Sequence, residues 1–260
     1  MLHQKLRKSY HNLKFRSKEL AIYLKALNKK ESTFKNKFFI FGQGRTGSTL
    51  LCSLLNSHPQ IFADLEILFN HVYFPEYYVE SKSKLNLNSV YGFKVKCYQL
   101  TRKQNINNPR QFVVDLINNN WKMIYLKRNN LFRHAISNIM AKKRGYFHLD
   151  KNQNKPSSEK IYIDYDDLMQ RMTNREKYLE IESKILEGLN YIEIVYEEDL
   201  INPLKHQTTV DKIYNFLGIQ SYPISTNLQR TVPDNISSLI QNYDEIVSSL
   251  KDTKYANFLP

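Results

Sequence analysis

The stretch FFIFGQGRTGSTLL, residues 38–51, is the part of the chain that most strongly determines its fold. Its apolar run at residues 38–41 predicts a buried strand, and the apolar spacing of residues 48–55 predicts a helix. Gly42, Gly44 and Gly47 stand between the two. A glycine-rich turn that leads into a helix favours a bound anion, because bare backbone N–H groups and the helix dipole both point toward it.

Strands and helices alternate along the rest of the chain. Further strands are expected at residues 91–98, 122–126 and 191–196, helices at 110–118, 166–186 and 203–217, and a polar surface loop at 150–159. This alternation predicts a parallel sheet covered by helices on both faces. We therefore expect a three-layer α/β fold with a central parallel sheet, like that of P-loop nucleotide kinases.

The first 36 residues form a basic segment that differs from the remainder. They predict one or two helices, in which Leu6, Leu13, Leu20, Tyr23 and Leu24 provide a weak apolar face for packing. We expect residues 1–36 to be a basic helical N-terminal extension. Residues 37–260 then form a single domain, since 260 residues lie near the upper limit for one hydrophobic core.

Composition and charge limit the classes of function. The chain is 42% hydrophobic and 13% aromatic, which predicts a globular protein, and its net charge of +13 favours anionic partners. A nucleic-acid-binding module is one alternative, although many lysines are dispersed singly. Cys52 and Cys97 form no disulfide framework or zinc-type spacing, and no apolar run is long enough to span a membrane. We expect a cytoplasmic protein without a membrane span.

Two nucleotide-binding motifs partly match the glycine loop. Residues 42–47 satisfy the dinucleotide pattern GxGxxG, with Asp64 about twenty residues further on, but the residues before Asp64 make a poor second strand. The same loop has the frame of the nucleoside-triphosphate motif, with Ser48 where the phosphate-binding lysine should stand. Phosphoryl transfer from ATP is therefore an alternative function, but the loop lacks the lysine that this function normally uses.

A third interpretation accounts for the cation inside the loop. Arg45 lies within the loop, and Thr46, Ser48 and Thr49 surround the start of the helix. The segment FGQGRTGSTLLCSLLNSHPQI resembles the 5′-phosphosulfate-binding segment of sulfotransferases, particularly bacterial and carbohydrate-type members. The resemblance implies that residues 44–49 bind the co-substrate 3′-phosphoadenosine-5′-phosphosulfate (PAPS), and that no metal is required. Arg45 is then the expected electrostatic catalyst, because charge develops on the bridging oxygen as the donor is cleaved.

The resemblance extends to a second phosphate site. In MIYLKRNNLFRHAISNIMAKKRG, a predicted strand ends at Lys127 and Arg128, and Ser137 stands on the following helix. This resembles the family's 3′-phosphate segment, which implies that Arg128 and Ser137 bind that phosphate. Near the end of the chain, NLQRTVPDNISSLIQNYDEI resembles the loop that closes over the nucleotide, with Arg230 as the matching cation. The resemblance further implies a sulfate acceptor of the carbohydrate or small natural-product class and no nucleic-acid partner.

Sulfuryl transfer to a hydroxyl or amine needs a group that removes the acceptor's proton. Glu66 is the candidate base, because related sulfotransferases have a catalytic glutamate on the element after the glycine-loop helix. Asp64 and His71 are the competitors. The alternative role for Glu66 is that of an acid at the start of a helix over residues 67–73.

Two further groups of residues keep alternative roles. Lys94 and Lys96 share one face of a strand. One of them reaches the sulfate donor or the acceptor, or, alternatively, both are surface charges on an edge strand. An aromatic cluster either lines the acceptor pocket or, as we prefer, belongs to the core; it comprises Tyr73, Phe74, Tyr77 and Tyr78. The seven histidines show no metal-ligand pattern, so we expect no metal site.

Overall fold

The computed structural model describes residues 2–29, 36–104, 106–146, 149–150, 159–229, 232 and 235–260. The helices are α1 Leu2–Leu27, α2 Ser48–Leu55, α3 Pro75–Leu85, α4 Pro109–Asn118, α5 Leu131–Arg144, α6 Tyr165–Leu186, α7 His206–Leu217 and α8 Tyr243–Lys251. The strands are β1 Asn36–Gly42, β2 Ile61–Asp64, β3 Val90–Lys96, β4 Trp121–Lys127, β5 Leu149–Asp150, β6 Tyr191–Val195 and β7 Leu228–Gln229. Single π or 3₁₀ turns add η1 Gln99–Lys103, η2 Tyr196–Leu200, η3 Pro203–Lys205, η4 Ser237–Leu239 and η5 Ala256–Phe258.

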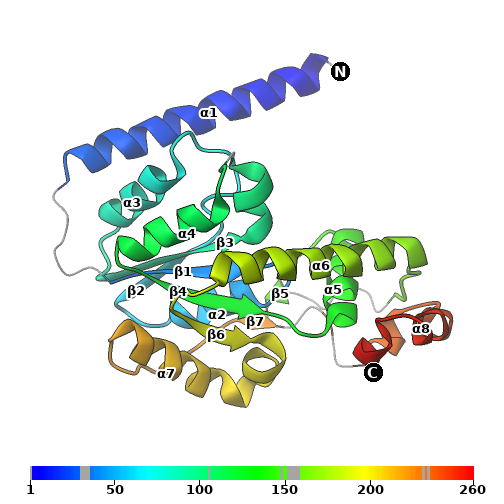
Figure 1. The fold of residues 1–260 in the computed structure, drawn as a ribbon. Helices are drawn as coiled ribbons and strands as arrows, with labels where there is room; N and C mark the ends of the chain where they lie inside the picture. Colours follow the sequence, from blue (N-terminus) through cyan, green and yellow to red (C-terminus); the bar gives the residue numbers. More distant parts are fainter. Residues whose placement is uncertain are drawn as a thin grey trace.

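A five-stranded parallel sheet forms the centre of the molecule, in the order β2-β3-β1-β4-β6 (Figure 1). The first strand is central, and its last residue, Gly42, pairs with Lys96 of β3 and Leu126 of β4. From β1 the chain crosses to β2 on one side, whereas from β4 it continues to β6 on the other. The carboxyl ends of β1 and β4 therefore border a point where the strand order reverses, which is where parallel α/β sheets bind ligands.

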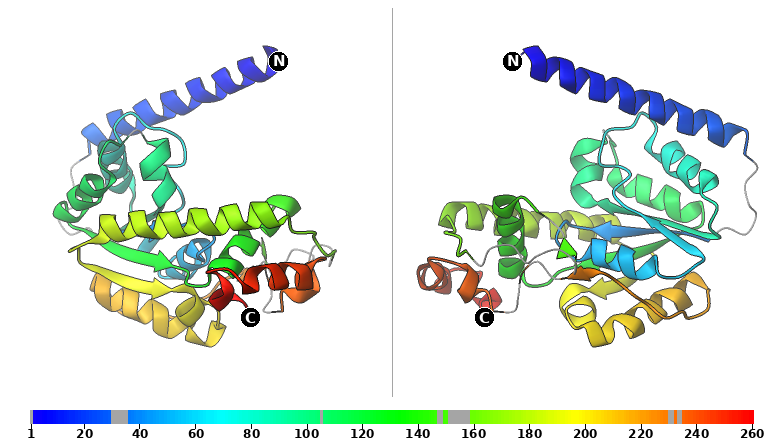
Figure 2. Two further views of the ribbon diagram at one scale, coloured as in Figure 1. Left: turned by 45° about the vertical axis from the view of Figure 1, so that its right-hand side comes forward. Right: turned by 180° about the vertical axis from the view of Figure 1, so that it is seen from behind.

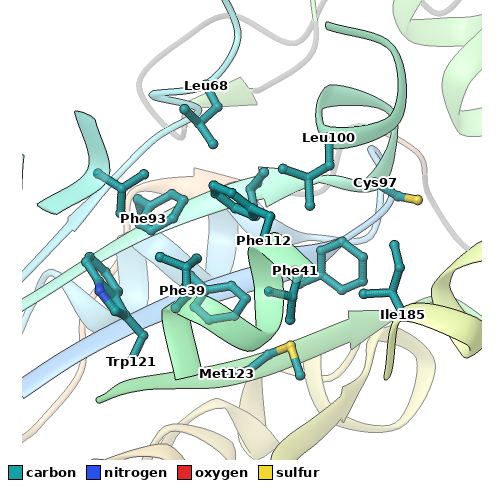
Figure 3. Close-up of a cluster of buried hydrophobic side chains, with 14 of the residues drawn as sticks. Phe39, Phe41, Leu68, Phe93, Cys97, Leu100, Phe112, Trp121, Met123 and Ile185 are labelled. Carbon is teal, nitrogen blue, oxygen red and sulfur yellow. The ribbon is translucent and has the colours of Figure 1, made fainter. Parts of the chain in front are cut away.

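Side chains of alternating direction build one core on each face of the sheet, as the strand period requires. Phe39 and Phe41 pack with Phe112 of α4 and Ile185 of α6 on one face (Figure 3). Phe38 and Ile40 point to the other face, where α2 and α7 provide the remaining side chains. The observed layers confirm the predicted three-layer fold, with α3, α4 and α6 on one face and α2 and α7 on the other.

The N-terminal extension forms one long helix, α1, on the outside of α3 (Figure 2). Its inner face agrees with the predicted one at Tyr23, and the side chain of Leu6 lies outside the described ones. Phe15, Ile22 and Tyr23 pack on the core and Ala26 is buried. Three leucines that were expected to pack on the protein are exposed to solvent instead, namely Leu13, Leu20 and Leu24. The spacing of the leucines indicated a helix correctly, but it could not show which of two apolar faces would meet the protein.

Three further differences from the sequence predictions bear on the site. The residues before Asp64 do form a strand, β2, which is short and lies at the sheet edge. Residues 67–73 form turns rather than a helix, so Glu66 is not an acid at a helix start. Third, the helix predicted for residues 203–217 begins later than expected: residues 203–205 form the turn η3, and α7 starts at His206. The loop predicted at 150–159 falls largely on residues 151–158, outside the described residues.

Candidate active site

A cavity of about 940 Å³ opens at the carboxyl end of the sheet, between the glycine loop and α6. Residues from both sequence-predicted phosphate segments line it, including Arg45, Ser48, Arg128 and Ser137. The two segments follow neighbouring strands, β1 and β4, whose carboxyl ends lie side by side. The topology thus brings together residues that are more than eighty positions apart in the chain.

The glycine loop has a backbone that most side chains would not permit. Gly42 has a φ of 156°, and a Cβ there would lie 2.2 Å from the carbonyl oxygen of Leu126. Gly47 adopts the left-handed conformation, with a φ of 89°, and a Cβ there would lie 2.8 Å from the Tyr196 ring. These two glycines allow the loop to press against β4 and the turn after β6, directly before α2 begins at Ser48.

Arg45 is also left-handed, with a φ of 71°, which is unfavourable for a residue with a side chain. Contacts from outside the loop hold this conformation. Arg128 Nη1 donates a hydrogen bond to the Arg45 carbonyl oxygen at 3.1 Å. Beside it, His134 Nε2 lies 2.6 Å from the carbonyl oxygen of Gly44; because burial lowers the pKa of His134 well below 6.5, the neutral ring donates from Nε2.

The predicted 5′ and 3′ phosphate residues meet in the cavity. Arg45 Nε donates a hydrogen bond to Ser137 Oγ at 3.1 Å, so the loop cation reaches the serine of the second segment. Burial lowers the pKa of Arg45, and burial lowers that of Arg128 to about 10, although the neighbouring Tyr196 and Glu197 oppose this shift. At this pKa the Arg128 guanidinium remains charged at neutral pH.

Arg128 is oriented by residues that the sequence analysis did not select. Its guanidinium carbon lies 4.5 Å from the centre of the Tyr196 ring, and Glu197 Oε1 is 3.5 Å from its Nε. The same carboxylate accepts hydrogen bonds from the backbone N–H groups of Asn129 and Asn130 at the start of α5. Arg128 Nε is buried and makes no hydrogen bond within the described part of the chain. A buried cation with a donor to spare suits an anionic ligand.

Glu66 lies in the cavity beside the loop and is held by two lysines. Lys96 Nζ is 2.8 Å and Lys94 Nζ 3.4 Å from Glu66 Oε1, and Gln99 Nε2 donates to Oε2 at 2.9 Å. Lys94 Nζ also donates to Thr49 Oγ1 at 2.7 Å. Burial alone would raise the pKa of Glu66, but the hydrogen bonds and charges of the two lysines bring it below the ordinary value.

The interpretation of Lys94 and Lys96 as edge-strand charges is wrong, because β3 lies between β2 and β1. Both lysines line the cavity. Asp64 and His71, the two competitors of Glu66 for the role of base, contact other parts of the protein. Asp64 is paired with Lys82 at 3.0 Å, and His71 faces α1, with Nδ1 3.0 Å from Arg16 Nη2. Neither lines the cavity that holds the glycine loop.

Helix α6 provides a wall of the cavity that no motif indicated. One stripe of the helix at spacings of three and four residues faces it, comprising Arg171, Asn174, Arg175 and Tyr178. Arg175 also binds the loop from behind, donating to Gln43 Oε1 at 3.3 Å. The helical periodicity of this segment was visible in the sequence, but its partner was not. Arg230, the expected cation of the closing loop, lies outside the described residues.

The aromatic cluster predicted for the core is mostly exposed. Tyr78 is buried, whereas Tyr73, Phe74 and Tyr77 face solvent, and none of the four lines the cavity. Within the described residues, no group of three His, Cys, Asp or Glu side chains is placed to hold a metal ion. Nor does any described helix have both the length and the apolar composition needed to cross a membrane.

Comparison with known proteins assigns the family. The sulfotransferase domain model matches residues 35–259, whereas no curated protein matches the sequence. Three solved structures are similar: a sulfotransferase from Alicyclobacillus acidocaldarius (13% identity, 85% of this chain and 95% of that chain, TM-score 0.47), mouse sulfotransferase SULT7A1 complexed with PAP (16%, 86% and 68%, 0.45), and the sulfotransferase domain of the Synechococcus PCC 7002 olefin synthase (16%, 90% and 92%, 0.40). These TM-scores are too low to support the assignment, which rests on the family model. Because that model covers most of the chain, the protein belongs to the sulfotransferase family and is a PAPS-dependent sulfotransferase.

Proposed function

We propose that the domain of residues 37–260 binds PAPS across the carboxyl ends of β1 and β4. The glycine loop, residues 44–49, would hold the 5′-phosphosulfate at the N-terminus of α2, where backbone N–H groups are available. Arg128 and Ser137 would hold the 3′-phosphate. The observation that supports this division most directly is the pair of contacts that Arg45 makes, to Ser137 by its side chain and to Arg128 by its carbonyl oxygen.

The position of Arg45 suggests a role at both ends of the nucleotide. Its guanidinium group is near the proposed 3′ site, while its backbone belongs to the proposed 5′ site. Lys94 and Lys96 provide further positive charge beside Thr49 and Gly44. We therefore assign stabilisation of the charge that develops on the bridging oxygen to Arg45 together with these lysines, rather than to Arg45 alone.

Glu66 is the proposed base. The acceptor oxygen or nitrogen forms a bond to sulfur as the bridging sulfur–oxygen bond breaks, the electron pair of that bond remains with the phosphate, and the acceptor proton passes to Glu66. The lysines on Glu66 keep it ionised at neutral pH, so it is ready to accept a proton. Their positive charges also weaken it as a base, which implies that proton transfer follows the development of charge on the acceptor.

The acceptor would be a hydroxyl or amine of a carbohydrate or a small natural product. The cavity that Glu66 lines is also lined by Phe69, Tyr98 and Tyr178. Asn138 and Asn174 add amide groups to the same cavity. Rings that offer flat apolar surfaces next to amide donors and acceptors suit a molecule with both apolar faces and hydroxyl groups.

Three measurements test this function. The 3′-phosphorylated product nucleotide should protect the protein against heat, with a gain of about 2.7 kcal/mol at one hundred times its Kd, while ATP should not. An acceptor screen with labelled PAPS, followed by mass spectrometry, would identify the substrate. Equal protection by ATP would favour a phosphoryl-transfer enzyme, and salt-sensitive binding of DNA or RNA without any nucleotide response would favour a nucleic-acid-binding module.

The proposed base has its own test with matched carboxylate and imidazole controls. Glu66→Gln keeps the size of the side chain but cannot accept the proton, and should reduce kcat by roughly 10²- to 10⁴-fold at saturating substrates. Asp64→Asn and His71→Ala, which change residues outside the cavity, should retain most of the activity. Near-normal turnover of a folded Glu66→Gln enzyme, with loss in one of the controls, would assign the base elsewhere.

We also infer that the protein works in a reducing compartment such as the cytoplasm. Cys52 and Cys97 are buried and unpaired in the described structure. The described structure therefore has no disulfide to stabilise it, which is the ordinary state of proteins in reducing compartments. Fractionation of the producing cells, with the protein detected by antibody, tests the compartment directly.

A further inference from the structure

Helix α1 has a second apolar face that nothing in the described structure covers. Leu13, Leu20, Leu24 and Leu27 are between 54% and 68% exposed. At about 100° per residue these four leucines fall within an arc of roughly 60°. The side of α1 that packs on the protein is centred roughly 130° away from the leucines around the helix. Since α1 is already anchored by that inner face, the exposed leucines are not needed to hold it in place.

Exposed aromatic residues extend this face beyond the helix. Tyr73 and Phe74 are 64% and 63% exposed, and Tyr77 is 39% exposed. They lie against α1, because the Tyr23 ring is 6.3 Å from that of Phe74 and 5.1 Å from that of Tyr77, and Arg16 stacks on Tyr73 at 4.0 Å. We call the four leucines and three aromatic residues the apolar strip. Contiguous exposed apolar surface of this kind marks an interaction site.

A further exposed side of α1, flanking the leucines, is positively charged. Lys14, Lys18 and Lys25 are exposed, and their helical positions fall within roughly 40° of one another, separated from the arc of the leucines by roughly 80°. Glu19, the one acid in the α1 sequence, is buried and bound by the Tyr23 hydroxyl, the Tyr73 N–H and Arg16. Its charge is therefore directed inward. The chain as a whole carries a net charge of +13.

We propose that the apolar strip and the three lysines bind the headgroup region of an anionic lipid bilayer, with α1 lying in the plane of the interface. Leucine and aromatic side chains enter the boundary between headgroups and acyl chains, and lysines bind anionic headgroups. The helix would then lie on the membrane and not cross it, since no described helix has the length and apolar composition to span one. A second copy would bring another basic helix against α1, whereas an anionic surface complements its charge.

The test is cosedimentation of the intact protein with vesicles. Phosphatidylcholine vesicles containing about one third phosphatidylglycerol should bind the protein, and pure phosphatidylcholine vesicles should bind it much more weakly. The double variant Leu20→Glu/Leu24→Glu should lose binding. Replacing Lys14, Lys18 and Lys25 together with glutamine should weaken it on the order of a hundredfold, since each cation contributes about fivefold. Raising the salt to about 0.5 M should weaken wild-type binding as well.

Exposed leucines elsewhere provide matched controls. Leu87→Glu and Leu204→Glu change side chains that are 91% and 88% exposed, and both variants should bind vesicles as the wild type does. The heat protection given by the product nucleotide should be unchanged in all variants, which shows that they fold. Equal binding to both kinds of vesicle, or wild-type binding by Leu20→Glu/Leu24→Glu, would refute the proposal. So would concentration-dependent dimerisation that this double variant abolishes, in a protein that ignores vesicles.

Discussion

Replacing Glu182 with glutamine should change how the stability of the protein depends on pH. Glu182 is buried on α6, where its Oε2 accepts hydrogen bonds from Tyr125 at 3.1 Å and Gln43 at 3.4 Å. Its Oε1 makes no hydrogen bond within the described residues. Burial raises the pKa of Glu182 to about 7 from an ordinary 4.5, although Gln43, Tyr125 and Arg175 oppose the rise.

The direction and size of the effect follow from this difference in pKa. Below about pH 4.5, Glu182 is protonated in both the folded and the unfolded chain. As the pH rises toward 7, only the unfolded chain releases the proton, so the free energy of unfolding falls. The interval from 4.5 to about 7 corresponds to a loss of about 3 kcal/mol, because each pH unit is worth about 1.4 kcal/mol.

Urea unfolding of the wild type and Glu182→Gln at several pH values between about 5 and 8 measures this loss. The variant lacks the titrating carboxyl and does not suffer this loss. The free energy of unfolding of the variant, minus that of the wild type, should therefore increase as the pH rises. Any constant difference between the two proteins cancels when only the pH dependence is compared. Parallel curves over the whole range would show that Glu182 ionises normally in the folded protein, and would refute the reasoning.

Three predictions concern the active site. Arg45→Ala should lower kcat by roughly 10²- to 10³-fold while the nucleotide still binds, measured by steady-state kinetics and calorimetry; an unchanged kcat would remove Arg45 from the mechanism. Arg128→Ala should weaken product nucleotide binding by roughly 1.5–3 kcal/mol and Ser137→Ala by less, and both should erase the preference over the 3′-dephosphorylated form. Lys96→Met removes a charge that lowers the pKa of Glu66, so the fall of kcat on acidification should begin at a higher pH than in the wild type. If the pH dependence of kcat is the same in Lys96→Met and the wild type, Glu66 is not the base whose titration controls kcat.

The sequence predicted best those elements whose signals are local. The helix at residues 48–55 was predicted with its observed bounds, because left-handed Gly47 ends the loop and an apolar run follows directly. The parallel sheet followed from the alternation of strands and helices. The edge strand β2 was missed, because an edge strand of four residues with alternating burial provides little periodicity to detect.

The surroundings of Glu66 show what local signals cannot provide. Residues 67–73 have apolar spacing that suggests a helix, yet the chain there is held by a side chain from far away in the sequence. Gln104 accepts a hydrogen bond from the N–H of Val72 and donates to the carbonyl oxygens of Leu68 and Asn70. Those backbone groups are satisfied without a helix, so the local pattern is overridden. Glu66 was selected by its resemblance to a family position, whereas its lysine partners were found only in the structure.

The glycine loop is shaped by residues that no loop motif contains. Three consecutive loop residues are each held from a different part of the chain: Gln43 by Arg175 on α6, Gly44 by His134 on α5, and Arg45 by Arg128 after β4. These contacts offset the cost of left-handed Arg45, about 1–3 kcal/mol, before any ligand arrives. The conformation of the loop is therefore fixed by the fold around it. Substitutions at Arg175 or His134, outside the glycine-loop sequence, should consequently alter nucleotide binding through the conformation of the loop.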